Sequence, residues 1–584
     1  MNITLIKTRV YAPCLIIILA SVLLYHSTFR YSLAGDDYCV LQRAGNSGPW
    51  WSLWIGRDTL RDMLKVHGWT DNVLVYGSDV FRPGLIWYHK FARLIFSENE
   101  VGFRALKLLS MTIFCVAGAM FLAGYFGAGG NGFVICLCGL FLLLCNPNRA
   151  LMRRTFTEGI SYLSGALILC ALYMHMRSGE KDASGRDVAP ICGLFALALC
   201  FRENGIGFAG MAILVDWAAG RSFRKQSRSY IAYSGVTIIY LAIRWLYYGG
   251  SFGSYGTASL GEMIGTRNGI SALVEKAPSI IYHEIPRECL FPGTSVAQYV
   301  IAGALLVITL LIQIIYSRQD FVAGFRKPGA LAGCAILALG PGWLVRVDSL
   351  YCLLPAVFMI GLLLEAADLR RIAAQPARLK SASAWCLLLP LIISVSLMAG
   401  NWIKLDIKER RPEKAELLRQ EFRRLVQSLD RKSQAPWAVV FLALPCDWEY
   451  DLFDNVPEPA VPMLTDGRGF GKAVVLYHWK AITSDVQVNC WKSNELWRPG
   501  EKCYSIAPLG EYEPYFPQVA GVRLPFSNVA FKVLNIAGPP VSVDISLDAD
   551  WFGSFREVHV VYHDGRAFRE LDHLRPALKD AEPR

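Results

Sequence analysis

Residues 12–40 read APCLIIILASVLLYHSTFRYSLAGDDYCV, an apolar run that leads into an acidic pair. The run from Ala12 to Phe29 is about 18 residues long, close to the length of a membrane span. Lys7 and Arg9 precede it as in a signal peptide, but no small-x-small cleavage site closes it, so we expect an uncleaved first membrane helix. Asp36 and Asp37 follow it, and two adjacent carboxylates near lipid need a cation, a donor or water.

The composition identifies a membrane protein with many spans. Of the 584 residues, 53% are hydrophobic and 18% are charged, against about 25% charged in soluble domains, and the mean hydropathy is +0.33. The net charge of +11 does not indicate nucleic acid, because many of the charges fall in short loops between apolar segments. Many of the 16 cysteines lie inside apolar runs, where they act as small apolar side chains.

The apolar runs predict a polytopic α-helical membrane module over residues 1–402 with about eleven transmembrane segments. The segments expected are 12–29, 105–126, 132–147, 158–176, 189–201, 205–218, 230–248, 297–316, 329–345, 350–366 and 383–402.

Loop charges orient this module. Basic residues fill the loops 177–188, 219–229, 317–328 and 367–382, and all four fall on the side of Lys7 if every segment crosses. Positive loops favour the cytoplasm, so we expect a cytoplasmic N-terminus. The loop with Arg149, Arg153 and Arg154 dissents, which indicates either a topology error or an anion site.

The short segments at 189–218 predict a helical hairpin that rises from the cytoplasm and turns at Phe201–Gly205, near the outer surface. Two long outer segments, 30–104 and 249–296, flank it in the sequence. The first mixes tryptophans with charges, which is typical of helices that lie along a membrane surface.

The composition changes after residue 402. A charged amphipathic helix is expected over 403–430, followed by strands at 438–444, 472–477, 486–489, 531–536, 541–547 and 557–562. Residues 403–584 therefore predict a soluble, β-rich α+β domain, which the topology places outside the cytoplasm. In that oxidising compartment Cys490 and Cys503 are a plausible disulfide, although spacing does not decide among these and Cys446.

Two motifs carry the chemistry expected of this chain. Asp36 and Asp37 are candidates for a general base or for ligands of a divalent cation, Mg²⁺ or Mn²⁺, and their alternative role is a turn. Arg82, in FRPGLIWYHKFARLIF (81–96), precedes a proline that starts helices, so it is expected to pair with either aspartate, to meet a phosphate, or to form a surface ion pair.

The hairpin tip FRENGIG (201–207) places Arg202 and Glu203 inside an apolar stretch. Charges there are costly and functional by default, so Arg202 is expected to bind a phosphate and Glu203 to orient it. The alternative is an ion pair that packs helices. Further polar residues near outer span ends are expected to line the same cavity: Arg346, Arg244, Glu158 and Arg154.

These motifs resemble the GT-C class of integral-membrane glycosyltransferases, in particular bacterial O-antigen-modifying (GtrII-type) and mannosyltransferase-like members. The matching residues are Asp36 and Asp37 in GDDY, Arg82–Pro83, the tip Arg202–Glu203–x–Gly205, and more weakly Arg346 with Tyr351. The resemblance covers about residues 1–400 and leaves the tail uncovered. Some relatives have lysine where this chain has Arg202.

The resemblance implies a sugar transfer from a polyprenyl-phosphate donor to a glycan or glycolipid acceptor, as in cell-envelope polysaccharide and lipopolysaccharide modification at a bacterial inner membrane. It assigns the base or metal ligand to Asp37 or Asp36, and the phosphate site to Arg202 with Arg346. A carboxylate base contributes about 10²–10⁴-fold, and stabilisation of the departing phosphate contributes more.

Two other functions compete. A transporter or flippase of lipid-linked saccharide also has charges within the membrane and broken helices, but no internal repeat is visible here. A surface-polysaccharide polymerase or ligase usually depends on a large, late, arginine-rich outer loop, whereas the acidic pair here lies in the first loop.

Overall fold

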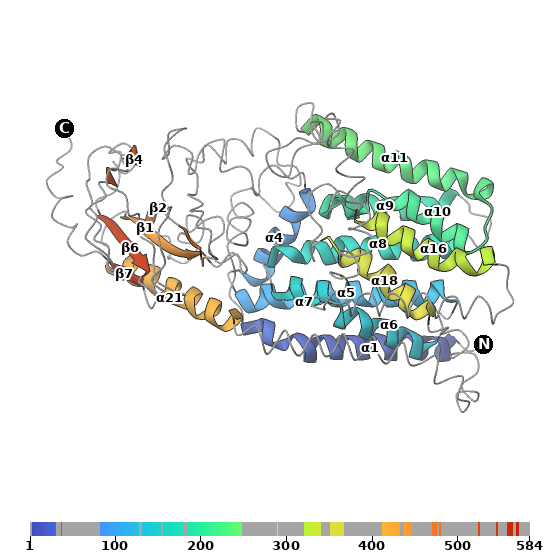
Figure 1. Ribbon diagram of the computed structural model, residues 1–584, viewed down its shortest axis with the longest axis horizontal. Helices are drawn as coiled ribbons and strands as arrows, with labels where there is room; N and C mark the ends of the chain where they lie inside the picture. Colours follow the sequence, from blue (N-terminus) through green and yellow to red (C-terminus); the bar gives the residue numbers. More distant parts are fainter. Residues whose placement is uncertain are drawn as a thin grey trace. The chain divides into compact units, whose positions relative to one another are not determined.

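The computed structural model describes residues 3–30, 37, 82–97, 99–127, 131–153, 156–178, 185–247, 289, 321–339, 351–366, 411–432, 437–446, 470–475, 478–480, 524–525, 545–546, 557–563 and 568–570. The chain divides into two compact units (Figure 1). Unit 1 is Met1–Tyr31 with Val80–Glu409, and unit 2 is Ser32–Asp79 with Arg410–Arg584. Each unit is described separately below.

Unit 1 is helical throughout its described part. Its helices, with short 3-10 segments labelled η, are α1 (Ile3–Tyr25), η1 (His26–Arg30), α4 (Pro83–Phe96), α5 (Glu100–Tyr125), α6 (Gly132–Leu144), α7 (Asn146–Arg153), η3 (Phe156–Glu158), α8 (Gly159–Ser178), α9 (Gly185–Phe201), η4 (Glu203–Gly205), α10 (Phe208–Ala218), α11 (Phe223–Tyr247), α16 (Phe321–Ala338) and α18 (Leu353–Ala366).

Three helices in the described part of the chain are long and apolar enough to cross a membrane. They are Tyr11–Phe29, Glu100–Tyr125 and Phe156–Ser178, and four shorter apolar helices accompany them at Gly132–Leu144, Val188–Phe201, Phe208–Ala218 and Leu353–Glu365. Unit 1 is therefore a polytopic helical membrane module. The segments expected at 297–316 and 383–402 lie outside the described residues.

The first helix shows how the bundle meets its surroundings. Leu15, Leu19 and Leu23 repeat every four residues along α1 and are exposed, whereas Ile17 and Ser21 on the other face are buried. Residues four apart share one face of a helix, so the exposed stripe faces the membrane lipid and the buried stripe packs on the bundle. Gly139 of α6 leaves room for the Ile17 side chain there.

Capping residues define two of the core helices. The Oδ1 of Asn99 accepts from the backbone N–H groups of Val101 and Gly102 at 3.0 and 3.3 Å, which begins α5. This start lies five residues before the predicted one. Asn131 caps α6 in the same way. Side-chain oxygens at this position satisfy backbone donors that a helix leaves without partners.

Other helix boundaries also differ from expectation. The segment predicted at 132–147 stops at Leu144, because Cys145 is extended (φ −67°, ψ 147°). A separate helix, α7, then begins, and Pro147 lies in its first turn, where its missing N–H costs no hydrogen bond. The segment predicted to begin at 329 starts instead at Phe321, so that the basic pair Arg326–Lys327 is helical.

The predicted hairpin is two helices with a short break. α9 and α10 are separated by η4, at the tip expected from the charged residues in the apolar stretch. Phe195 of α9 stacks on Phe208 of α10, with ring centroids 4.6 Å apart. Figure 1 shows both helices between α8 and α11.

The described part of unit 2 contains a five-stranded sheet, a two-stranded sheet of β4 and β5, and one long helix. The strands are β1 (Trp437–Cys446), β2 (Phe470–Val475), β3 (His478–Lys480), β4 (Leu524–Pro525), β5 (Ile545–Ser546), β6 (Glu557–His563) and β7 (Phe568–Glu570). The main sheet has the order β2-β1-β6-β7, with β3 also paired to β1. β1 is parallel to β2, β3 and β6, while β6 and β7 are antiparallel.

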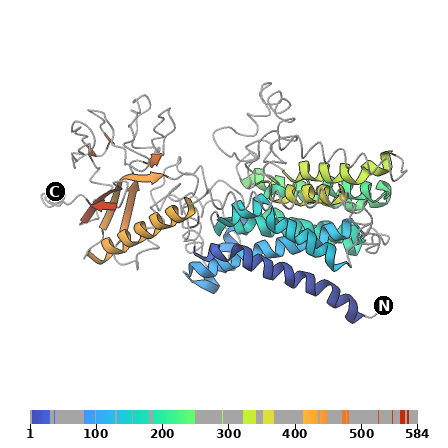
Figure 2. The same cartoon turned by 60° about the horizontal axis from the view of Figure 1, so that its bottom comes forward.

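The helix α21 (Arg411–Lys432) lies along this sheet (Figure 2). Its Phe422 contacts Phe568 of β7, with ring centroids 6.0 Å apart. Near its end Asp430 accepts from the Trp437 indole N–H at 3.2 Å. The amphipathic helix and the strands expected at 438–444, 472–477 and 557–562 are found. The stretches 486–489 and 531–536, and Cys490 and Cys503, lie outside the described residues.

Candidate functional site

The candidate site is the break between α9 and α10. The last residue of α9 is Phe201, after which Arg202 is extended (φ −159°, ψ 144°) and η4 begins. The three residues Arg202, Glu203 and Asn204 are 1%, 0% and 5% exposed. Ser164 of α8 fixes the break, because its hydroxyl donates to the carbonyls of Ala198 and Arg202 at 3.0 and 3.4 Å.

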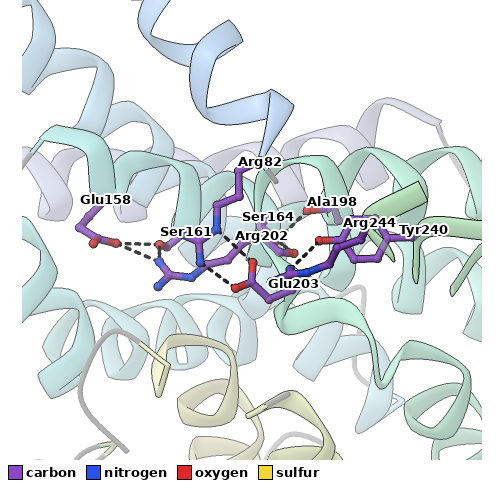
Figure 3. Close-up of polar contacts among 9 residues, drawn as sticks. All are labelled: Arg82, Glu158, Ser161, Ser164, Ala198, Arg202, Glu203, Tyr240 and Arg244. Atoms are coloured by element: carbon purple, nitrogen blue, oxygen red, sulfur yellow. Dashed lines mark hydrogen bonds and ion pairs between the residues drawn. The ribbon is translucent and has the colours of Figure 1, made fainter. Parts of the chain in front are cut away.

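Glu203 forms a two-pronged ion pair with Arg82 (Figure 3). The Arg82 Nε donates to Oε2 at 3.0 Å and Nη2 donates to Oε1 at 2.7 Å. Parallel bonds of this kind fix both groups in one plane and are among the stronger hydrogen bonds in proteins. Arg82 precedes α4, whose first residue is Pro83, as the sequence predicts. Gly84, one residue on, allows α4 to approach Phe201 closely.

Arg202 pairs with a different element. Its Nη1 donates to Oε2 of Glu158 at 3.0 Å and also to the hydroxyl of Ser161 (Figure 3). Ser161 in turn donates to the same carboxylate oxygen at 2.9 Å. The Arg202 guanidinium carbon lies 5.2 Å from the centroid of the Tyr351 ring, within reach of a cation–π contact. The adjacent charges of the tip are therefore connected to α4 and to η3.

A third arginine adds positive charge. Arg244 of α11 is 8% exposed, and its Nη1 donates to the Tyr240 hydroxyl at 3.4 Å. Burial would raise the pKa of Glu203, but the charges of Arg82, Arg244 and Arg202 hold that pKa below its ordinary value. Three guanidinium groups thus face two carboxylates, Glu203 and Glu158, so these five side chains carry one net positive charge.

Aromatic packing holds Glu158 in position. Phe156 of η3 lies between Tyr88 of α4 and Phe103 of α5, with ring centroids 4.8 and 5.2 Å away and near-parallel rings. His89 meets the same ring edge-on at 5.1 Å, and its Nε2 lies 3.2 Å from the Thr157 hydroxyl. Offset stacks of this type are favourable beyond their buried area. α4 therefore reaches the site twice, through Arg82 directly and through η3.

Two polar atoms of the tip have no hydrogen-bond partner in the described part of the chain. They are Nε of Arg202, a donor, and Oδ1 of Asn204, an acceptor. A buried polar group without a partner costs about 1–3 kcal/mol. Both atoms therefore favour a ligand that supplies an acceptor and a donor.

The structure brings together five of the nine residues that the sequence singles out: Arg82, Arg202, Glu203, Glu158 and Arg244. Asp37 is described and is fully buried, and it belongs to unit 2. The other three, Asp36, Arg154 and Arg346, lie outside the described residues. Within the described ranges no group of three or more His, Cys, Asp or Glu side chains is placed to hold a metal.

Sequence reasoning missed Ser161, Ser164 and Asn204. Ser161 follows Glu158 by three residues and so shares its face of a helix, which is a usable signal. Asn204 lies between the charged pair and Gly205, where it passes as a turn residue. The contact between Ser164 and the end of α9 depends on helix packing, which no local pattern reveals.

A second buried polar cluster joins α8, α10 and α11. Asp216 accepts from Tyr230 at 2.6 Å and from Arg221 at 3.0 Å, and its Oδ2 lies 3.0 Å from Nε2 of His175. The other ring nitrogen of His175 lies 3.1 Å from the Tyr233 hydroxyl. Because every member has a partner, the cluster fixes the relative positions of three helices.

The basic loop around Arg149, which the expected topology places on the outer side, is also buried in part. Arg149 of α7 is 4% exposed, and Lys107 of α5 donates to the carbonyl of Leu151 at 2.5 Å. Lys107 therefore ties α5 to α7.

Comparisons with known proteins identify no family for this chain. Neither the protein-family models nor the curated proteins contain a match to this sequence. Among solved structures, the crystal structure of ArnT from Cupriavidus metallidurans bound to undecaprenyl phosphate is similar, with 11% sequence identity, a TM-score of 0.34, and coverage of 79% of this chain and 85% of that one. A likeness of this size establishes neither a family nor an activity for this chain.

Proposed function

We propose that this protein is a glycosyltransferase that moves a sugar from a polyprenyl-phosphate carrier to a glycan or glycolipid acceptor on the outer side of a bacterial cytoplasmic membrane. The observation that carries the proposal is Arg202. Its guanidinium is buried at a break between apolar helices, it is held by Glu158 and Ser161, and its Nε has no partner in the described part of the chain.

The chemistry requires a cationic site and a base. The acceptor hydroxyl attacks the anomeric carbon, the bond from that carbon to the phosphate oxygen breaks, and the polyprenyl phosphate leaves with the electron pair. The positive charge of Arg202 and its neighbours stabilises the departing phosphate. Arginine suits this role because its planar donors match phosphate oxygens. Arg82 and Glu203 hold the tip in place.

In this proposal the acidic pair accepts the proton that the acceptor hydroxyl loses. We assign this to Asp37, with Asp36 holding the loop or, together with Asp37, a divalent cation such as Mg²⁺ or Mn²⁺. Burial of Asp37 supports a role other than that of an exposed turn. Arg346 and Arg154 are assigned to substrate binding together with Arg202, and residues 403–584 to an extracytoplasmic domain.

The test uses cells that lack the protein and are complemented with wild type, Asp36→Asn, Asp37→Asn or Arg202→Ala. Mass analysis of lipid-linked sugars and envelope glycans should show an unmodified glycan and an accumulated lipid-linked sugar in the deletion strain. Asp37→Asn should reach the membrane in normal amount and fail to restore the modification. Full activity of both aspartate variants would overturn the assignment of the base. An unchanged glycan and lipid-linked sugar pool in the deletion strain would overturn the function.

A further inference from the structure

The two buried atoms without partners at the tip indicate a ligand that carries more than a phosphate group. Arg202 and Asn204 are two residues apart, on either side of Glu203, and both side chains are at least nine-tenths buried. Within the described ranges, one has an N–H without an acceptor and the other has a carbonyl oxygen without a donor. A ligand that satisfies both must present an acceptor to Arg202 and a donor to Asn204, which one residue separates in the sequence.

The other contacts of Arg202 limit which kind of ligand atom can accept a hydrogen bond from its Nε. Its Nη1 is occupied by Glu158 and Ser161, and Tyr351 lies over the guanidinium. Nε is the buried Arg202 nitrogen that has no acceptor among the described residues. With Arg82 and Arg244 nearby, the excess charge among the described side chains around it is positive, so an anionic oxygen is favoured over a neutral one.

The contact needed by Asn204 is different. A fully ionised phosphate has acceptors only and cannot satisfy the Asn204 oxygen. A sugar hydroxyl donates, and a phosphate-linked sugar places hydroxyls within a few atoms of the phosphate. A site built for a hydroxyl discriminates strongly against ligands that lack it, because its buried polar group is then left unpaired.

We propose that Asn204 is a specificity-determining residue that accepts a hydrogen bond from a hydroxyl of the donor sugar while Arg202 Nε binds the adjoining phosphate. This inference rests on the proposed function and extends it to the sugar. Asn204 then distinguishes the loaded carrier from the spent one: the loaded carrier satisfies both atoms, and bare polyprenyl phosphate satisfies only Arg202.

The experiment measures two affinities of the purified full-length protein. The probes are decaprenyl phosphate and decaprenyl phosphohexose, the latter prepared with glucose and with mannose. The quantity of interest is the Kd for decaprenyl phosphate divided by the Kd for decaprenyl phosphohexose, because effects common to both ligands cancel in this ratio. Bare decaprenyl phosphate is a monoester with up to two negative charges and the phosphohexose is a diester with one, so the wild-type ratio also contains this difference in charge. The hydrogen bond to Asn204 is therefore measured as the change in the ratio between wild type and variant, about tenfold for one buried hydrogen bond.

Three variants separate the roles. Asn204→Leu, of similar size but without the acceptor, should shift the ratio about tenfold in favour of decaprenyl phosphate while it leaves the Kd for decaprenyl phosphate unchanged. Asn204→Asp retains an acceptor oxygen and should retain the ratio even if its charge weakens both ligands. Arg202→Gln should weaken both ligands. The matched control is Gln226→Leu, which removes another buried amide oxygen without a partner in the described chain and should change neither Kd.

The outcomes distinguish the role of Asn204 from the proposed glycosyltransferase function on which it rests. If wild type binds both ligands, Arg202→Gln weakens both, and Asn204→Leu keeps the wild-type ratio, the role of Asn204 is wrong and the proposed function stands. If wild type binds neither ligand, the proposed function fails and the role of Asn204 fails with it. Should Asn204→Leu not fold, loss of the ratio in Asn204→Asp would contradict the proposal.

Discussion

Arg82 and Glu203 are 121 residues apart in the sequence and form a two-pronged ion pair with N–O distances of 3.0 and 2.7 Å. Both side chains are largely shielded, at 11% and 0% exposure. The pair connects the start of α4 to the hairpin tip, so the position of Arg202 depends on a helix from an earlier part of the chain.

Removing one partner of this pair should be more harmful than removing both. Arg82→Met leaves Glu203 buried without its main partner, which typically costs about 3–5 kcal/mol. Glu203→Met does the same to Arg82, whereas the double variant replaces the pair by apolar side chains. Thermal unfolding of the detergent-solubilised protein should show a double variant more stable than the sum of the single effects predicts. Additive effects would contradict the coupling.

The charge of Glu203 should stabilise the fold down to acidic pH. Because its pKa in the folded protein lies below the ordinary value, its contribution is complete above the unfolded pKa, about 4.3, and is lost as pH falls through the lower folded pKa. The difference in melting temperature between wild type and Glu203→Gln should be constant from pH 5 to 8 and shrink below about pH 4. A decline that begins between pH 5 and 7 would indicate a raised pKa instead.

Gly84 should be intolerant of a methyl group. A Cβ there would lie 2.6 Å from Cδ1 of Phe201 and 3.0 Å from the Cys200 carbonyl oxygen, so Gly84→Ala should move α4 away from α9 and cost about 1–3 kcal/mol. Donor turnover should fall with it, since Arg82 moves with α4. The control is Gly235→Ala in α11, where a Cβ meets nothing within 4 Å and helix propensity favours alanine by up to about 1 kcal/mol. Equal effects of the two would argue against the close approach.

The cluster around Asp216 should matter for stability and not for ligand binding. Asp216→Asn removes the charge that Arg221 and Tyr230 bind and should lower the melting temperature, with a loss of about 1.5–3 kcal/mol for charged hydrogen bonds. The Kd for decaprenyl phosphate should stay at the wild-type value below the melting temperature. Arg224→Gln, an exposed change of charge in the same region, is the control. A weakened Kd without a change in stability would assign the cluster to the ligand site.

The sequence predicts that the site exists better than it predicts which side chains pair within it. Arg202 and Glu203 stand out because charge in an apolar stretch is costly, and Arg82 because a proline follows it. The partners depend on packing between helices distant in sequence. An ion pair that packs helices was one expectation for the tip, but the sequence does not name the partners: Arg202 pairs with Glu158 and Glu203 pairs with Arg82. The position of Phe156 between two aromatic rings, which fixes Glu158, has no local signature.

The spacing along α8 has a consequence for the membrane around this protein. Glu158 comes immediately before this helix and His175 lies in its last turn, seventeen residues apart, which is about 26 Å at 1.5 Å per residue. Each belongs to one of the two buried polar clusters, so the distance between the clusters is a property of a single rigid rod. A typical hydrocarbon core is about 30 Å thick, so α8 holds the two clusters apart by a little less than the thickness of such a core.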